Sequence, residues 1–396
     1  MKHGFLFVLV GSTFLLLSAC GKTPAGGEET KRQEISVISV QLLAYQGDIV
    51  DTKTTYNTGS GLFLWAEGDA VGIISSEGSQ LKFPIKEDYY GESYAKFDGR
   101  GFALLPEAAY FSITPFIADY DLDPLAVPIS YSGQTMDANN SLTGLGAYAY
   151  AVAQGVASSN SSLDFSFLNV GSPHRYSLPA MAGNFKSLTL SIPEADFITE
   201  GTLCLQEGSN SQLITITPSK TSEELALGLD GVSLDGTGML RGWMMMPPVD
   251  LTDQVIKLTL TSADGSAYLA SIQGKDCPAN SRRVFNALSS VYPAKQEIAC
   301  DGGNIQTSLI LSAESVEVTV STDDDWITVA SSETDGLVTT YSLTVDENTG
   351  SAREGTVSFT ETSTGLTNTV TIIQAKAGTV IGIGGWDSDN HSGTAN

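Results

Sequence analysis

The chain has 396 residues, of which 41% are hydrophobic, so it is long enough for two or three domains of roughly 100–200 residues, each with its own core. Its 45 acidic and 20 basic residues give a formal net charge of −25. This charge repels phosphate backbones and anionic lipid headgroups, which argues against nucleic acid as a partner. Any attachment to a membrane is therefore expected to be covalent rather than electrostatic.

Residues 1–20 have the features of a secretory signal peptide. A short basic start precedes an apolar stretch from Phe5 to Leu17, which is too short to span the hydrocarbon core of about 30 Å as a permanent helix. The stretch ends in Leu17-Ser18-Ala19-Cys20, which resembles the lipobox of bacterial lipoproteins. We therefore predict cleavage before Cys20, acylation of Cys20 by lipid (palmitate), and a flexible tether over residues 21–34.

Short alternating runs of apolar and polar residues predict an all-β chain, in which residues 35–157 form the first block. Glu67-Gly68-Asp69 is predicted to make a tight turn between two strands of this block. The stretch from Leu145 to Val156 comes nearest to a helical pattern, but its glycines argue against a stable helix. The predicted strands of the block include Ile35–Leu42, Leu62–Trp65, Val71–Ile74, Tyr94–Phe97 and Ala109–Ile113.

The same alternation of apolar and polar residues predicts strands in a second block over residues 158–294 and in a third over residues 295–376. The second block is predicted to open with the strand Leu163–Phe167, and Asp264-Gly265 between two alternating runs is a strong hairpin signal. The third block has short strands at regular spacing within about 80 residues, typical of an immunoglobulin-like sandwich. Residues 377–396 form a Gly-rich tail.

The first two blocks resemble the fimbrillin (Mfa-like) family of Bacteroidetes lipoproteins. The residues that carry this resemblance are the lipobox at Cys20, Phe63–Val71, Tyr94–Phe97, Pro128–Gln134, Tyr148–Tyr150, Asp164–Phe167 and Asp264-Gly265. The resemblance implies two tandem transthyretin-like β-sandwiches. It also implies a role in adhesion or in a pilus, as a stalk subunit, tip or anchor. Polymerising members of that family lose their first strand to an Arg-specific protease and then accept a strand from the next subunit.

This sequence departs from the polymerising pattern. Arg32 precedes the first predicted strand and the next arginine is Arg100, while Lys53 stands where a cut would open the groove. An anchor, a tip or a stand-alone adhesin is therefore favoured over a bulk stalk subunit, with other pilus subunits as partners if strands are exchanged.

The third block resembles a BACON domain. The match consists of Asp325-Trp326-Ile327, Asn348, Arg353–Val357 and Thr369–Gln374. The resemblance implies an immunoglobulin-like fold and suggests carbohydrate binding, with host or polysaccharide glycans as ligands. The alternative function is therefore a surface lipoprotein that captures polysaccharide through this block.

Two tryptophans are candidate ligand contacts. Trp326 is a candidate to stack on a sugar ring, although a core tryptophan between the two sheets is the competing and favoured interpretation. Trp386 in the Gly-rich tail is a candidate to contact a partner, although a disordered tail is the favoured interpretation. The acidic runs Asp119–Asp123, Asp323–Asp325 and Asp387–Asp389 have a superficial likeness to calcium ligands, but solvated acid is the favoured interpretation, and we predict no metal and no cofactor.

Catalytic residues are scarce in this sequence. Of its three histidines, only His174 lies outside the signal peptide and the tail, and no nucleophile elbow accompanies it. Cys204, Cys277 and Cys300 have no Cys-x-x-Cys spacing, so we expect buried thiols or one disulfide. The sequence therefore predicts a non-enzymatic protein that is lipid-anchored at the outer membrane and exposed on the cell surface.

Overall fold

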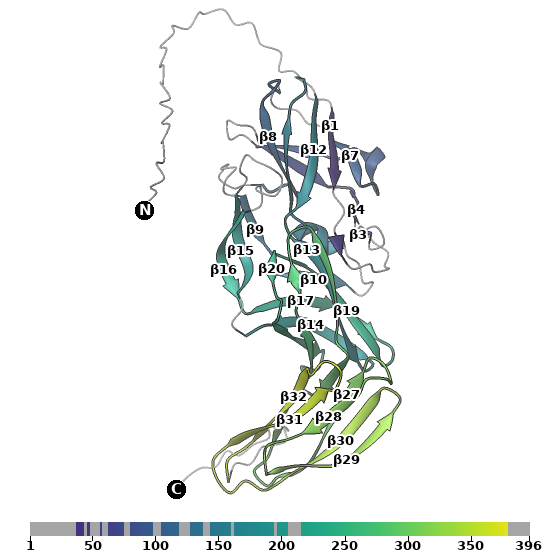
Figure 1. Cartoon of the computed structure of the whole chain (residues 1–396), viewed down its shortest axis with the longest axis vertical. Helices are drawn as coiled ribbons and strands as arrows, with labels where there is room; N and C mark the ends of the chain where they lie inside the picture. The colour runs from purple at the N-terminus through teal and green to yellow at the C-terminus, as the bar shows by residue number, and fades with distance from the viewer. Residues whose placement is uncertain are drawn as a thin grey trace, which may run out of the picture. The chain divides into compact units, whose positions relative to one another are not determined.

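The computed structural model describes residues 37–42, 46–47, 56–57, 62–74, 80–97, 104–118, 127–137, 143–159, 162–193, 196–204 and 215–378 (Figure 1). The signal peptide, Cys20, the tether, Trp386 and the acidic runs at Asp119–Asp123 and Asp387–Asp389 lie outside these residues. Within them the chain forms strands, turns and two short 3₁₀ helices, η1 (Glu87–Tyr89) and η2 (Thr143–Tyr148). The predicted all-β class is confirmed, and the stretch around Leu145 is not an α-helix.

The first block is built on one seven-stranded sheet. Its apolar side chains alternate along the strands and gather into one core, which includes Ile73, Phe97 and Phe165. A β-bridge between Ile85 and Phe97 joins the ends of the two edge strands, so the sheet curls around this core. In spatial order the strands are β6 (Gln80–Pro84), β5 (Ala70–Ile74), β8 (Ala109–Thr114), β11 (Ala151–Val156), β12 (Ser162–Asn169), β1 (Val37–Leu42) and β7 (Tyr94–Phe97).

The predicted turn at Glu67-Gly68-Asp69 is confirmed. Gly68 has a φ of 87°, and the Asp69 carboxylate accepts a hydrogen bond of 2.7 Å from the backbone N–H of Ala66. The strands on either side of this turn do not pair with each other, however. β4 (Leu62–Phe63) pairs with β3 (Tyr56–Asn57), whereas β5 pairs with β6 and β8.

The boundary predicted between residues 157 and 158 does not separate the strands of the first two blocks. β12, which was expected to open the second block, pairs with β1 and β11 of the first. Conversely, β9 (Val127–Ser130) and β10 (Gln134–Asp137) pair with strands of the second block. The chain therefore enters the second block, returns to finish the first sheet, and then crosses again.

Two sheets pack around the core of the second block, which includes Tyr176, Leu188, Leu258 and Met244. The predicted hairpin at Asp264-Gly265 is confirmed, because β21 pairs with β22 and Gly265 has a φ of 93°. One sheet contains β10, β17 (Glu224–Asp230), β14 (Gly183–Ser191), β21 (Val255–Ser262), β22 (Ala267–Gln273) and β25 (Ser289–Tyr292). The other contains β19 (Gly238–Met246), β13 (Ser172–Ala180), β24 (Ser281–Asn286) and β2 (Gln46–Gly47).

Smaller elements complete the second block. β9 pairs with β15 (Phe197–Cys204), which pairs with β16 (Thr215–Ser222). β18 (Ser233–Leu234) pairs with β14, and β20 (Val249–Asp250) pairs with β23 (Asp276–Cys277).

The third block is a sandwich whose first sheet continues directly from the second block. β25 pairs with β27 (Gly303–Leu311), which is followed by β30 (Val338–Val345) and β29 (Ile327–Asp335). The second sheet contains β26 (Lys295–Ile298), β32 (Thr367–Gln374), β31 (Arg353–Glu361) and β28 (Val318–Ser321). Leu309 and Leu343 of the first sheet and Phe359 and Val370 of the second share one core.

Candidate functional site

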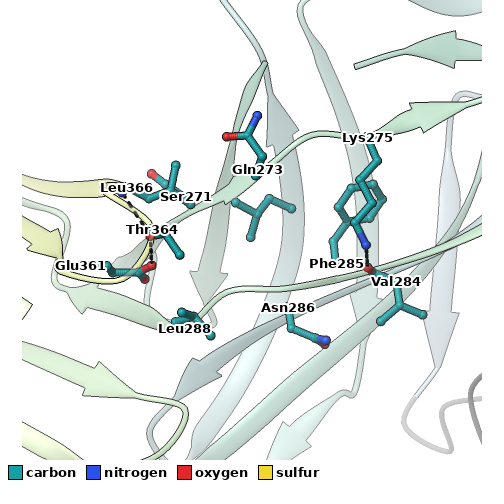
Figure 2. A pocket seen from close by; sticks show the side chains of 11 residues that line it. Ser271, Gln273, Lys275, Val284, Phe285, Asn286, Leu288, Glu361, Thr364 and Leu366 are labelled. Carbon is teal, nitrogen blue, oxygen red and sulfur yellow. Dashed lines mark hydrogen bonds between the residues drawn. The ribbon is translucent and has the colours of Figure 1, made fainter. Parts of the chain in front are cut away.

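A pocket lies where the second block meets the hairpin between β31 and β32. Its volume is about 350 Å³. Figure 2 shows Glu361, Thr364 and Leu366 on one side of it, and Lys275 and Phe285 on the other. The lining residues come from β22 and β24, from the residues just after each of these strands, and from the hairpin between β31 and β32. They are Ser271, Ile272, Gln273, Lys275, Val284, Phe285, Asn286, Leu288, Glu361, Thr364 and Leu366.

Hydrogen bonds that cross from one block to the other hold the hairpin side of the pocket. Glu361 is 1% exposed, and its two carboxylate oxygens accept hydrogen bonds from Ser289 Oγ (2.7 Å) and Thr364 Oγ1 (2.6 Å). The Asn368 amide donates to Ser289 Oγ at 2.9 Å. Ser271 Oγ donates to the carbonyl of Thr367 at 2.9 Å. Because a buried carboxylate is tolerated only when its oxygens are paired, this network fixes the hairpin against the second block.

Aromatic packing holds the opposite side. The ring of Phe285 stacks on Tyr176, with centroids 5.0 Å apart and planes 6° from parallel. Lys275 Nζ lies 5.3 Å from the Phe285 centroid and donates a hydrogen bond of 3.0 Å to the carbonyl of Val284. Phe285 is 2% exposed, so its ring is part of the core and not a surface for an aromatic ligand contact.

The pocket combines polar groups with an apolar floor. Ser271, Gln273, Lys275 and Asn286 supply hydroxyl, amide and ammonium groups beside apolar side chains such as Leu288. Such a lining suits a small molecule with both hydroxyl groups and an apolar face. The charged side chains of the lining are Lys275 and Glu361, and both carboxylate oxygens of Glu361 already accept hydrogen bonds from Ser289 and Thr364.

Trp326 belongs to the core of the third block, and the stacking role considered for it is not compatible with its position. It is 8% exposed, and the guanidinium carbon of Arg353 lies 4.2 Å from its ring centroid. The backbone of Gly355 passes so close to the ring that a Cβ there would collide with Trp326. The ring is therefore already covered by its own chain.

The acidic triplet at residues 323–325 is part of a turn. The Asp324 carboxylate accepts a hydrogen bond of 2.8 Å from the backbone N–H of Thr356, and the Asp324 N–H donates to Thr322 Oγ1 at 3.2 Å. Across the described residues, no group of three or more histidine, cysteine, aspartate and glutamate side chains is placed to hold a metal ion.

His174 is buried on β13 between two hydroxyl groups. Its Nε2 lies 2.9 Å from Ser172 Oγ, and its Nδ1 lies 3.1 Å from the Tyr176 hydroxyl. Burial, together with the positive charges of Arg283 and Lys275, lowers the pKa of His174 to about 3. The imidazole is therefore neutral at physiological pH. Because its exposed fraction is 0%, no substrate reaches the Ser172–His174 pair.

Cys204, Cys277 and Cys300 are free thiols, so of the two alternatives that the sequence left open, the one with a disulfide is excluded. The Cys277 thiol donates to the carbonyl of Lys275 at 3.2 Å, and burial raises its pKa to about 12. Cys277 is therefore a packing residue and not a nucleophile. In the part of the chain that the structure describes, no helix has the length and hydrophobicity needed to cross a membrane.

The fold is that of an all-β protein whose blocks are joined by shared strands and sheets, with a pocket between the second and third of them. Residues 314–375 match the model of the BACON family, described as "Putative binding domain, N-terminal". This match confirms the BACON domain predicted for the third block. No curated protein matches the chain.

Three solved structures similar to this chain come from adhesion and fimbrial proteins. A "putative cell adhesion protein" from Bacteroides ovatus ATCC 8483 is 13% identical, with 64% of this chain and 92% of that chain covered and a TM-score of 0.41. Another "putative cell adhesion protein", from Bacteroides eggerthii DSM 20697, is 12% identical, with 65% and 88% covered and a TM-score of 0.29. The tip fimbrial protein Mfa3 from Porphyromonas gingivalis, with a C-terminal truncation, is 11% identical, with 60% and 81% covered and a TM-score of 0.27.

Proposed function

We propose that this chain is a non-enzymatic, lipid-anchored protein of the outer membrane that acts on the cell surface in adhesion, or as the anchor, tip or accessory subunit of a pilus. The position of β1 supports this proposal best. β1 lies between β12 and β7, with six residues in register on one side and four on the other. While β1 stays in place both of its ladders are paired, and only its loss would open the sheet to a strand from another subunit, as a bulk stalk subunit needs.

The basic residues near β1 favour an end or accessory position over a bulk stalk position. A cut after Arg32 removes the lipid but leaves β1 in place, and the next arginine, Arg100, follows β7. Lys53 is the only basic residue between β1 and β3. An Arg-specific protease therefore finds no site that would release β1 alone, and the sheet stays closed.

An immunoblot of the outer-membrane fraction tests this position in the pilus. Unheated and boiled samples of the native protein should both run as one band at the size of the lipidated monomer. Lys53→Arg, which supplies the missing arginine, should produce a heat-sensitive ladder in a strain that has an Arg-specific surface protease. A heat-sensitive ladder from the native protein would contradict the proposal and make the chain a stalk subunit.

The lipid anchor has its own test. Cys20→Ala should move the protein from the membrane fraction to the soluble fraction and abolish metabolic labelling by a clickable palmitate analogue, since the acidic chain has no electrostatic attraction for the bilayer. Ser18→Ala, which keeps the small residue that the peptidase needs, should change neither result. Membrane retention and labelling of the Cys20→Ala protein would contradict the anchor.

Capture of polysaccharide is a second candidate function, and the pocket favours it. Hydroxyl, amide and ammonium groups beside an apolar floor suit one or two sugar rings, and the hairpin of the BACON segment forms one side. Electrophoresis of the intact chain through gels containing neutral polysaccharides is the test. Retardation that is lost in Asn286→Ala, but kept in the exposed control Glu354→Ala, would support this function. Retardation that persists unchanged in Asn286→Ala and Gln273→Ala would contradict it.

A further inference from the structure

β29 is an edge strand of the sheet that has the most strands in the described part of the chain. Within the described residues it pairs only with β30, so one side of its backbone has no strand beside it. A register shift lies between Val329 and Ser331, and beyond it the strand is regular. Residues 331–335 pair one to one with residues 342–338, and all five are exposed. This segment therefore presents an exposed row of backbone N–H and C=O groups on the side away from β30.

The other long edge strands in the described part of the chain carry residues that discourage pairing. β6 contains Lys82 and Pro84, β16 contains Pro218 and Lys220, and β19 contains Arg241. Proline removes a hydrogen-bond donor, and a cationic side chain on an edge opposes strand addition. β29 is nine residues long and contains no proline, lysine or arginine. It is thus the long edge that lacks this protection.

The stretch of sequence that contains β29 is strongly acidic, which favours a basic partner. Between Lys295 and Arg353 the sequence contains no basic residue, whereas its acidic residues number eleven: Glu297, Asp301, Glu314, Glu317, Asp323, Asp324, Asp325, Glu333, Asp335, Asp346 and Glu347. Two of these, Glu333 and Asp335, lie on the exposed part of β29 itself. A second copy of this chain would bring like charges together, whereas a basic strand would find them complementary.

We propose that the outer edge of β29, residues 331–335, binds an extended segment rich in lysine or arginine from another protein, which adds to the sheet as a further strand. Backbone hydrogen bonds supply the pairing, and the carboxylates select the sign of the partner's charge. This inference concerns an edge of the third block and stands independently of the proposed function.

A model peptide tests the edge directly. The probe is a fluorescent peptide of alternating valine and lysine, seven residues long, and the protein is the whole mature chain carrying Cys20→Ala. We expect binding by fluorescence anisotropy and at least tenfold slower amide hydrogen exchange at residues 331–335. The same peptide with alternate backbone nitrogens methylated keeps its charge but loses its donors, and it should bind at least tenfold more weakly. Equal binding of the two peptides, or no slowing of exchange at these residues, would overturn the proposal.

Matched variants separate strand pairing from simple charge attraction. Ser332→Lys places a cation on the edge and should weaken binding of the peptide at least tenfold. Ser351→Lys makes the same charge change at an exposed position outside the strands and should weaken it less than threefold. Equal losses would show charge attraction alone and overturn the proposal.

Two further outcomes would assign the edge to another occupant. If a chain that ends at Gly378 shows faster exchange at residues 331–335 than the whole chain, the chain's own tail covers the edge. If light scattering shows a dimer that Ser332→Lys dissociates, the occupant is a second copy. Either outcome overturns the proposal, whereas a monomer with unchanged exchange after truncation supports it.

Discussion

The guanidinium carbon of Arg353 lies 4.2 Å from the ring centroid of Trp326, so the two residues form a cation–π pair inside the third block. Arg353 Nε also donates to Gln374 Oε1 at 2.8 Å, and its Nη2 donates to the carbonyl of Asp346 at 3.0 Å. Gln374 is fully buried and in turn donates to the same Asp346 carbonyl at 2.8 Å. Arg353 thus contacts both Trp326 and Gln374. All three residues belong to the BACON motif, so these contacts give the motif a structural role.

Loss of the Arg353 side chain should destabilise the third block. Arg353→Ala removes the cation–π contact and the charged hydrogen bonds, so the free energy of unfolding should fall by about 2 kcal/mol. Denaturant titration measures this change. The neighbouring exposed residue provides the control, because Glu354→Ala should change the free energy by less than about 0.5 kcal/mol. If Arg353→Ala unfolds at the native midpoint, the pair contributes nothing.

A methyl group at Gly355, which also lies against the Trp326 ring, should likewise destabilise the third block. A Cβ there would collide with Trp326 and lie 2.8 Å from the Asp324 carboxylate. We expect Gly355→Ala to cost about 1–3 kcal/mol, as overpacking does. At Gly350 the nearest atom to a new Cβ is Asn348 Oδ1 at 3.7 Å, so Gly350→Ala should be nearly neutral in the same titration. Equal stabilities of the two variants would refute the close approach.

The hydrogen bond between Ser289 and Glu361 should couple the second and third blocks. A double-mutant cycle of Ser289→Ala and Glu361→Ala should give a coupling free energy of about 1–3 kcal/mol, because a charged hydrogen bond between buried groups is lost in either single variant. Thermal unfolding of the two single variants and the double variant supplies the cycle. Additive losses would show that the two side chains do not interact.

His174 should make the protein less stable in acid. Its pKa is near 3 in the folded chain and about 6.5 when unfolded, so below pH 6.5 the unfolded state takes up a proton that the folded state does not. The contribution is complete above pH 6.5 and is lost by about 1.4 kcal/mol per pH unit as the pH falls toward 3. His174→Gln removes the titrating group and should flatten the stability curve across that window. Parallel curves for the two proteins would contradict the buried neutral imidazole.

The thiols should differ in reactivity. In the chain carrying Cys20→Ala, Cys277 and Cys300 are buried and Cys204 is partly exposed. A disulfide reagent at pH 8 should therefore modify Cys204 first, and Cys277, whose pKa is raised to about 12, at least about tenfold more slowly. Peptide mapping by mass spectrometry identifies the modified residue. In denaturant all three should react alike, and early modification of Cys277 in the folded chain would contradict its burial.

Local patterns located many of the strands correctly. The runs at Tyr94–Phe97, Ala109–Ile113 and Asp264-Gly265 appear where alternation and turn chemistry predicted them. The pocket was not predicted, because its walls come from β22, β24 and the hairpin around Thr364, which are far apart in sequence. No periodicity within one strand signals such a meeting.

The sequence by itself determined the class of the fold, because alternation with a period of two and glycine turns are properties of neighbouring residues. It also determined the BACON segment, whose motif spans residues 325–374. Only the tertiary structure decided that β12 completes the first sheet, that β25 joins the second block to the third, and that Trp326 is covered. Strand pairing depends on backbone hydrogen bonds that any residue other than proline can make, so the choice of partner is settled only when all the strands compete for the same core.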